Sequence, residues 1–166
     1  MKSPALRLLF AAIVIGCTLF VFLTSAQLPD PVASHFALDG RANNRMSRDA
    51  YQAFMTGVTL LIPLLLVVFQ VWLPRHYPRF LSIPRRNYWL APEHRQQMLD
   101  YLERHTLIFG GAPALFFAGM HWMILDANSR MLPQLNNSLF LAIAGLFVVW
   151  VIAAAVTLSL HFRRAA

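Results

Sequence analysis

Four long apolar runs, separated by three polar segments, dominate the pattern of the chain. The runs cover residues 5–27, 51–73, 106–125 and 138–162. A helix needs about 20 apolar residues to cross the hydrocarbon core of a bilayer. Unpaired backbone polar groups are costly in lipid, so runs of this length favour helices. The pattern predicts an all-α integral membrane protein, with residues 1–166 forming a single membrane domain built as a four-helix transmembrane bundle.

Composition supports the same class. The chain has 166 residues, of which 58% are hydrophobic and only 13% charged, and its mean hydropathy is +0.53. These values are too apolar for an ordinary soluble domain. The net charge of +7 would suggest nucleic acid as the partner of a soluble protein, but here the arginines flank apolar runs. Topology and anionic lipid headgroups explain that placement better. We therefore expect the lipid bilayer as a partner, and no nucleic acid.

The distribution of basic residues predicts the orientation. A cytoplasmic N-terminus places ten of them inside, namely Lys2, Arg7, Arg75, Arg79, Arg85, Arg86, Arg95, Arg104, Arg163 and Arg164. Only four, Arg41, Arg45, Arg48 and Arg130, are then outside. By the positive-inside rule, both termini are cytoplasmic, loop 28–50 is external and loop 74–105 is cytoplasmic. Apolar sequence continues well beyond Cys17, which favours a signal anchor over a cleaved signal or a lipoprotein leader. We expect a multi-pass protein of a bacterial inner membrane.

The external loop begins with the stretch "LPDPVASHFALDG". Its prolines disfavour helix at the preceding residues, and its glycine suits a turn with positive φ. Two readings of His35 stay open: a pH-sensitive, metal-binding or peptide-contacting group, or a structural group that caps a helix end or bonds a loop carbonyl. Ser47 or Asn44 is expected to cap the second helix. The candidate binding residues of this loop are Pro29, Asp30, Pro31, His35, Phe36 and Gly40.

The cytoplasmic segment "IPRRNYWLAPEHRQQMLDYLERH" predicts a turn followed by a helix that starts at Pro92. Met98, Leu99, Tyr101 and Leu102 give this helix an apolar face, so we expect a short interfacial helix that lies on the membrane before the third span. The segment is either a docking surface for a partner or a topological anchor. Its candidate binding residues are Arg85, Arg86, Tyr88, Trp89 and Pro92.

Together the two stretches resemble the small membrane proteins grouped as domain of unknown function 1648, a family related to bacteriocin-immunity membrane proteins of the sporulation-delaying type. The resemblance covers most of the first three spans. It rests on a first span followed by Pro29, Pro31, His35, Phe36 and Gly40, and on a companion motif with Tyr88, Trp89, Leu90 and Pro92. It implies a membrane protein that acts by binding, as an immunity protein does, and it supplies no catalytic residue. The four spans expected here are fewer than immunity members usually have.

The third span carries Gly110, Gly111, Pro113 and Gly119, which predict a kink and close packing against a neighbouring helix. His121 and Asp126, near its external end, are expected to form structural hydrogen bonds with each other or with the loop. Four other polar side chains in the spans are read as inter-helix hydrogen-bonding groups: Thr56, Thr59, Gln70 and Thr157.

No motif of an enzyme or a metal site is present, so we expect no catalysis, no metal and no cofactor. Two functional hypotheses follow. The first is an immunity-like or sensing protein that binds an extracellular peptide through its external loop. The second is an accessory or stabilising subunit of a larger membrane protein complex, held through the third helix and the cytoplasmic segment.

Overall fold

The structure, a computed structural model, describes residues 4–163. Within them, four helical stretches are long and apolar enough to cross a membrane. They are Pro4–Gln27, Arg48–His76, Pro92–Asn128 and Asn137–Arg163. The prediction of a largely helical chain with four spans is therefore confirmed at the level of helix number, length and composition. Lys2 and Arg164, which the orientation argument used, lie outside the described residues.

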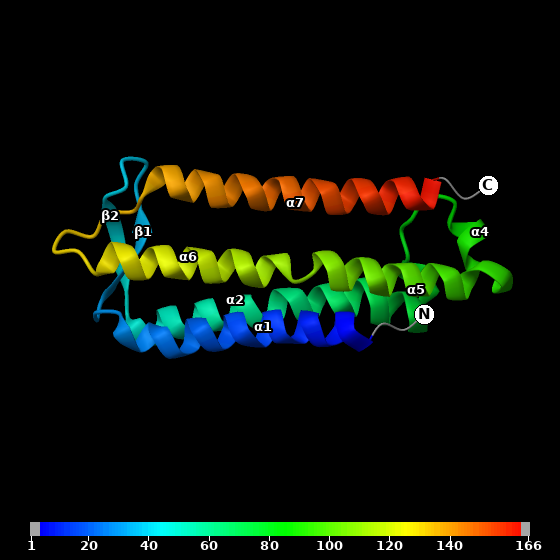
Figure 1. Ribbon diagram of the computed structural model, residues 1–166, viewed down its shortest axis with the longest axis horizontal. Helices are drawn as coiled ribbons and strands as arrows, with labels where there is room; N and C mark the ends of the chain where they lie inside the picture. The colour runs from blue at the N-terminus through cyan, green and yellow to red at the C-terminus, as the bar shows by residue number, and fades with distance from the viewer. Residues whose placement is uncertain (1–3, 164–166) are drawn as a thin grey trace.

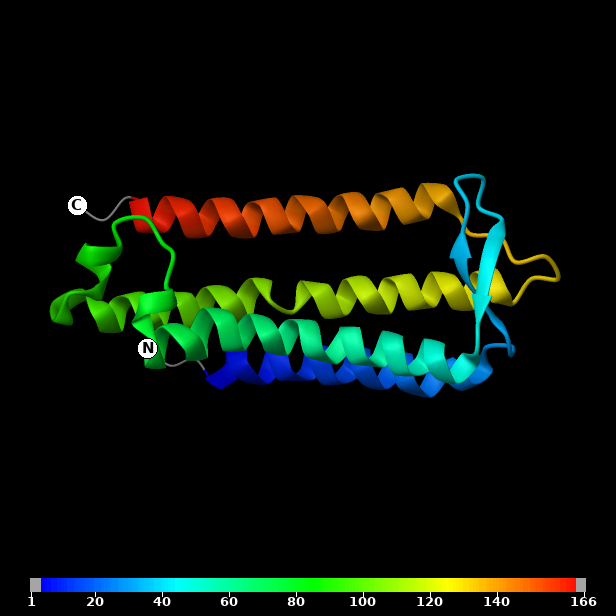
Figure 2. The same cartoon turned by 180° about the vertical axis from the view of Figure 1, so that it is seen from behind.

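The long helices form three layers (Figure 1). α1 (Pro4–Thr24) and α2 (Arg48–Val67) lie along one side of α5 (Pro92–Phe109) and α6 (Ala112–Asn128). α7 (Asn137–Arg163) lies along the opposite side and packs chiefly on α5 and α6. The view from behind shows the same order (Figure 2). α1 begins and α7 ends at one end of the bundle, which we call the terminal end; the opposite end is the hairpin end.

The segment between α1 and α2 differs from the expected all-α architecture, because it folds into a β-hairpin. β1 (Val32–Phe36) pairs antiparallel with β2 (Ala42–Met46), with Val32 opposite Met46 and Phe36 opposite Ala42. Gly40 turns the chain with φ of +82°, as predicted. Val32 and Ala33 are buried against the helices. The hairpin thus covers the end of the bundle rather than forming an irregular loop.

The second span begins where the sequence predicts. The Ser47 hydroxyl accepts a hydrogen bond from the Ala50 amide at 3.3 Å, so Ser47 is the helix cap. Pro63 lies inside α2 without ending it. The span continues through a π-helical turn, Val68–Trp72, into α3 (Leu73–His76). The second span is therefore one continuous helical stretch that reaches the terminal end of the bundle.

The third span overturns the expectation of a separate interfacial helix. α5 and α6 run nearly in line, with only Gly110 and Gly111 between them (Figure 1). Together they make a helical stretch of 37 residues, about 55 Å long at 1.5 Å per residue. A hydrocarbon core is about 30 Å thick, so an upright stretch of this length is longer than such a core and part of it lies outside. The glycine break falls just before Pro113, at the predicted kink.

The apolar face of α5 packs on protein, which is the physical reason that α5 does not lie flat. Residues from α5, the short helix α4 (Arg86–Leu90), the connection before α4 and the end of α7 form one core cluster: Leu81, Trp89, Met98, Leu99, Leu102 and Phe162. The Trp89 indole donates to the Phe162 carbonyl at 3.2 Å. That bond satisfies a carbonyl that the end of a helix leaves unpaired.

An ion-pair cluster fastens the same end of the bundle. The Glu103 carboxylate on α5 pairs with Arg7 on α1 and, at 3.5 Å, with Arg75 on α3. Three spans therefore meet at one carboxylate. Arg7 and Arg75, both predicted to lie on the cytoplasmic side, therefore also hold the helices together through this carboxylate.

The glycines of the third span pack inside the chain. A Cβ atom on Gly111 would lie 3.5 Å from the Ile13 side chain of α1, and one on Gly119 would lie 3.8 Å from Ile143 of α7. These are ordinary contact distances, so α1 and α7 pack beside these glycines at a spacing that an alanine would also fit. The close packing predicted for this helix is satisfied by its own neighbours.

Candidate functional site

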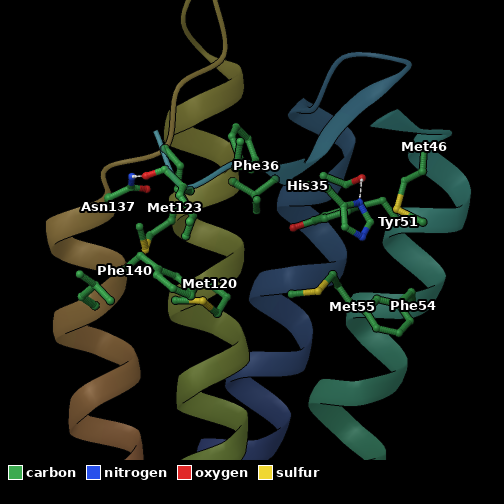
Figure 3. Close-up of a pocket in the computed structure, with 16 residues that line it drawn as sticks. His35, Phe36, Met46, Tyr51, Phe54, Met55, Met120, Met123, Asn137 and Phe140 are labelled. Carbon is green, nitrogen blue, oxygen red and sulfur yellow. Dashed lines mark hydrogen bonds between the residues drawn. The ribbon is translucent and has the colours of Figure 1, made fainter. Parts of the chain in front are cut away.

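An apolar cavity of about 610 Å³ lies beneath the hairpin, between α2, α6 and α7. We call it the hairpin cavity. Figure 3 shows Tyr51, Phe54 and Met55 of α2 on one side, Asn137 and Phe140 of α7 on the other, and side chains of α6 between them. Its full lining is Ser34, His35, Phe36, Ala37, Leu38, Met46, Tyr51, Phe54, Met55, Met120, Met123, Ile124, Leu135, Asn137, Phe140 and Leu141.

Methionine and aromatic side chains dominate this lining. Four methionines, from the hairpin, α2 and α6, meet phenylalanines from β1, α2 and α7. Methionine is unbranched and polarisable, so it adapts its shape to different apolar partners. The volume lies within the range typical of small-molecule sites. The cavity is therefore suited to an apolar ligand of variable shape rather than to one rigid molecule.

The polar groups of the cavity gather at its hairpin side. His35 is exposed at the rim, and its Nδ1 lies 3.0 Å from the Ser34 hydroxyl (Figure 3). The Asn137 amide donates to the Leu38 carbonyl. The lower walls are apolar apart from the Tyr51 hydroxyl. A ligand would meet hydrogen-bonding groups at the rim and hydrocarbon below, which suits a molecule with one polar and one apolar part.

The turn of the hairpin is fastened to the segment before α7. The Leu135 amide donates to the Gly40 carbonyl at 2.8 Å, and Arg41 forms a bridge with Gln134. A Cβ atom on Gly40 would lie only 2.6 Å from the Leu135 carbonyl oxygen. Glycine is required here twice, by the positive φ and by this close approach. The two connections therefore form one continuous roof over the cavity.

The inner wall of the cavity is held by a buried polar network around His121. The Thr24 hydroxyl donates to the Phe20 carbonyl at 2.5 Å, so it accepts from His121 Nε2, which lies 2.8 Å away. A neutral imidazole then has a bare Nδ1, which accepts from the Tyr51 hydroxyl at 3.0 Å. His121 is fully buried and both its nitrogens are bonded. The network joins α1, α2 and α6 where they support the hairpin.

Of the two arrangements expected for His121 and Asp126, the structure does not contain the bond between them. The Asp126 carboxylate instead pairs with Arg130, one helical turn further on, at 2.7 Å. Residues five apart on a helix do not share a face, whereas residues four apart do. His121 therefore faces the bundle, whereas Asp126 is partly exposed beside Arg130.

The structure brings together only some of the predicted external residues. His35 and Phe36 line the hairpin cavity, and Gly40 forms its turn. Pro29 and Pro31 are exposed in the connection before β1 and are not among the lining residues. The Asp30 carboxylate accepts from the Arg48 amide at 3.2 Å, so it supports the start of α2.

The predicted cytoplasmic residues divide in a similar way. Trp89 is only 3% exposed and belongs to the core cluster, which makes it a structural residue rather than a docking one. Arg86 is half-buried and donates to the Pro78 carbonyl at 3.2 Å. Arg85, Tyr88 and Pro92 are exposed. Any docking surface on this segment consists of those three, without the tryptophan.

Most of the cavity lining was not predicted from the sequence. Met46, Met55, Met120, Met123 and Asn137 carry no local signal that separates them from side chains facing lipid. Only the contact between hairpin, α2, α6 and α7 assigns them to one site. The number of methionines is the single sequence feature that points towards an adaptable apolar surface.

Among residues 4–163, no group of three histidine, cysteine, aspartate or glutamate side chains is placed to hold a metal ion. Comparison of the chain with family models, with curated proteins and with solved structures gives no match. The resemblance to the family named above therefore stays a prediction, and the function is argued from the geometry of the site.

Proposed function

We propose that this chain is a non-enzymatic, multi-pass protein of a bacterial inner membrane that acts by binding. The proposed ligand is an apolar segment of an extracellular peptide, and the site is the hairpin cavity. The single observation that carries the proposal is that the β-hairpin covers a methionine-rich cavity of about 610 Å³. In the proposed orientation, the hairpin end faces outwards and both termini are cytoplasmic.

The chemistry of the cavity supports a peptide segment as the ligand. Apolar side chains of the peptide would enter among Phe36, Met123 and Phe140, where they lose contact with water. Its backbone polar groups would remain near the rim, where His35 and Ser34 offer hydrogen-bonding atoms. Adaptable apolar surfaces of this kind suit partners that vary in sequence.

The resemblance to immunity proteins supports the same direction. Those proteins neutralise a toxin at the membrane, and binding a peptide at the outer surface is a step that such a role needs. A sensing role would use the same contact, with binding transmitted through the buried network of Thr24, His121 and Tyr51. Both roles belong to the proposal, and both require the cavity to be accessible from outside.

The proposal is tested by filling the cavity. Ala37 lines it and has a small side chain, so Ala37→Trp would occupy the space of a ligand. Ala53→Trp places the same ring on an exposed position of α2 outside the cavity and is the matched control. The probe is a fluorescent leucine- and phenylalanine-rich peptide, added to nanodiscs that contain the protein. Binding above that of empty nanodiscs is expected for wild type and Ala53→Trp and to be lost in Ala37→Trp. Equal binding by all three proteins would contradict the proposal.

An accessory-subunit role is the second candidate. The observation that favours it is the exposure of α7, whose most apolar 18-residue window contains no buried residue. A larger complex would cover that helix. Gentle purification followed by mass spectrometry separates the two candidates. A stoichiometric membrane partner, lost with α7 surface variants but not with Ala37→Trp, would favour the subunit role, and a stable protein that purifies alone would exclude it.

A further inference from the structure

The β-hairpin has two outer edges, and they differ in what lies beside them. On the β2 side, the segment before α7 lies along the hairpin, because Arg41 forms an antiparallel bridge with Gln134. On the β1 side, no strand within residues 4–163 pairs with the edge. An unpaired strand edge presents N–H and C=O groups that can pair with another chain.

The open edge of β1 borders the hairpin cavity. Five consecutive residues, 34–38, line the cavity from β1 and the start of the turn, whereas β2 contributes only Met46. Consecutive side chains of a strand alternate between its two faces, so a cavity that borders all five residues lies beside the edge rather than under one face. In both ribbon views, β1 is the strand on the side of the helices (Figures 1 and 2). The cavity is therefore bordered by main-chain groups as well as by apolar side chains.

The hydrogen bonds of Ala37 indicate which main-chain groups are open. Its amide donates to the Arg41 carbonyl at 2.8 Å, and its carbonyl accepts from the Gly40 amide at 2.9 Å, so both point into the hairpin. Successive residues of an antiparallel strand direct these groups to opposite edges. The N–H and C=O of Phe36 therefore point to the open edge, and no hydrogen bond joins them to a residue outside the hairpin within residues 4–163. Main-chain groups that lose contact with water need a partner.

Asparagine side chains already pair with this side of the hairpin before and after Phe36. The Asn128 amide of α6 accepts from the Ala33 amide and donates to the Ala33 carbonyl, both at 2.9 Å. These are the two bonds that a residue of a neighbouring strand would make. The Asn137 amide of α7 donates to the Leu38 carbonyl. The edge is thus complementary to amide groups, and the part beside the cavity is the part left open.

We propose that the peptide binds to the hairpin cavity in an extended conformation and adds to β1 as a third strand. One residue of the peptide donates its N–H to the Phe36 carbonyl and accepts from the Phe36 amide with its C=O. Neighbouring peptide side chains enter the apolar cavity. Main-chain pairing of this kind selects an extended segment without proline at the paired position, and it tolerates variation in the apolar side chains. This inference rests on the peptide-binding function proposed above and specifies the form of the ligand.

The test changes the peptide backbone and leaves the protein unchanged. Three forms of the leucine- and phenylalanine-rich peptide are added to the full chain in nanodiscs, with empty nanodiscs as the background. One is unmodified, one carries N-methyl groups on its three central residues, and one carries three extra methyl groups on the side chains of those residues. The third peptide matches the added carbon and keeps every N–H. We expect the N-methylated peptide to bind about tenfold more weakly than the other two, since it loses the main-chain hydrogen bonds.

The outcomes separate this inference from the function on which it rests. Equal binding by the unmodified and N-methylated peptides would contradict strand addition and leave the peptide-binding function in place. Binding by none of the three peptides would contradict the peptide-binding function itself.

Two variants of one residue locate the pairing. Phe36→Ala and Phe36→Pro both remove the ring from the cavity, but only proline also removes the N–H. Proline is tolerated in an edge strand where the N–H points away from the partner strand. Phe36→Ala is expected to keep the tenfold difference between the unmodified and N-methylated peptides, and Phe36→Pro to lose it. A difference retained in a folded Phe36→Pro protein would contradict the assignment; if that variant does not fold, the three peptides on wild type decide the question.

Discussion

The Tyr51 hydroxyl lies 3.0 Å from Nδ1 of His121, and this contact joins α2 to α6 at the wall of the hairpin cavity. Nε2 of the same ring is bonded to Thr24 of α1, so one imidazole connects three spans. His121 therefore has a structural role, as expected, but its partners are Thr24 and Tyr51. The network also sets the position of Tyr51, which lines the site.

Removing the hydroxyl tests that role. Tyr51→Phe leaves His121 Nδ1 buried without a donor, and an unsatisfied buried acceptor costs about 1–3 kcal/mol. We expect a corresponding fall in the free energy of unfolding, measured in detergent by denaturant titration. Tyr88→Phe is the matched control, because Tyr88 is exposed and its hydroxyl makes no hydrogen bond within residues 4–163. Equal stability of the two variants would show that the network contributes nothing.

The roof of the cavity depends on Gly40. Gly40→Ala forces an L residue into the left-handed region, which costs about 1–2 kcal/mol, and places Cβ against the Leu135 carbonyl. We expect faster proteolysis of the hairpin, followed by mass spectrometry of the fragments. Gly16→Ala is the control, since nothing lies within 4 Å of its added Cβ, and alanine in a helix is about 0.5–1 kcal/mol more favourable than glycine. Unchanged proteolysis of Gly40→Ala would contradict this account of the turn.

Features that depend on neighbouring residues could be predicted from the sequence, whereas features that depend on contacts between distant residues could not. Span number and length, the Ser47 cap and the Gly40 turn follow from local composition, and all are present. The β-hairpin could not be predicted, because β2 reads "ANNRM", a polar sequence with few strand-forming residues. β1 is fixed instead by a distant contact, in which the Asn128 side chain exchanges two hydrogen bonds with the Ala33 backbone.

The helix α5 illustrates the same limit. Its apolar face at Met98, Leu99 and Leu102 was identified correctly, but an apolar face packs equally well on lipid or on protein. Only the presence of Trp89 in α4 and Phe162 at the end of α7 decides in favour of protein. The polar residues of the spans divide likewise. Gln70 and Thr157 bond to α5, as expected for inter-helix groups, whereas the Thr59 hydroxyl bonds within its own helix and the Thr56 hydroxyl has no partner within the described chain.

The buried position of Trp89 leads to a prediction on stability rather than on binding. Trp89→Ala removes a large core side chain and the cap of α7, and we expect a loss of about 3–5 kcal/mol. Its neighbour Tyr88 is exposed but its ring stacks on His94 and meets the edge of Trp89, so Tyr88→Ala is expected to cost less, about 0.5–1.5 kcal/mol. Thermal unfolding in detergent measures both variants. A stable Trp89→Ala protein would restore the docking interpretation of this residue.

The proposed orientation is tested by labelling single cysteines. Cys17 is the only cysteine of the chain, so a Cys17→Ser background is free of thiols. Leu38→Cys, at the fully exposed tip of the hairpin, is expected to react with a membrane-impermeant maleimide in intact cells. Tyr88→Cys is expected to react only after the membrane is opened. The reverse pattern would invert the protein and remove the external site.

The central claim, that the hairpin cavity binds an apolar peptide segment, is tested most directly by photo-crosslinking. The leucine- and phenylalanine-rich peptide, carrying a diazirine, is added to the protein in nanodiscs and irradiated, and the modified residues are mapped by mass spectrometry. A second peptide, with aspartate in place of the leucines, measures non-specific labelling. We predict adducts concentrated on Met46, Met120, Met123 and Phe140, with little labelling by the acidic peptide. Adducts spread over the outward face of α7 with none in the cavity would contradict the claim.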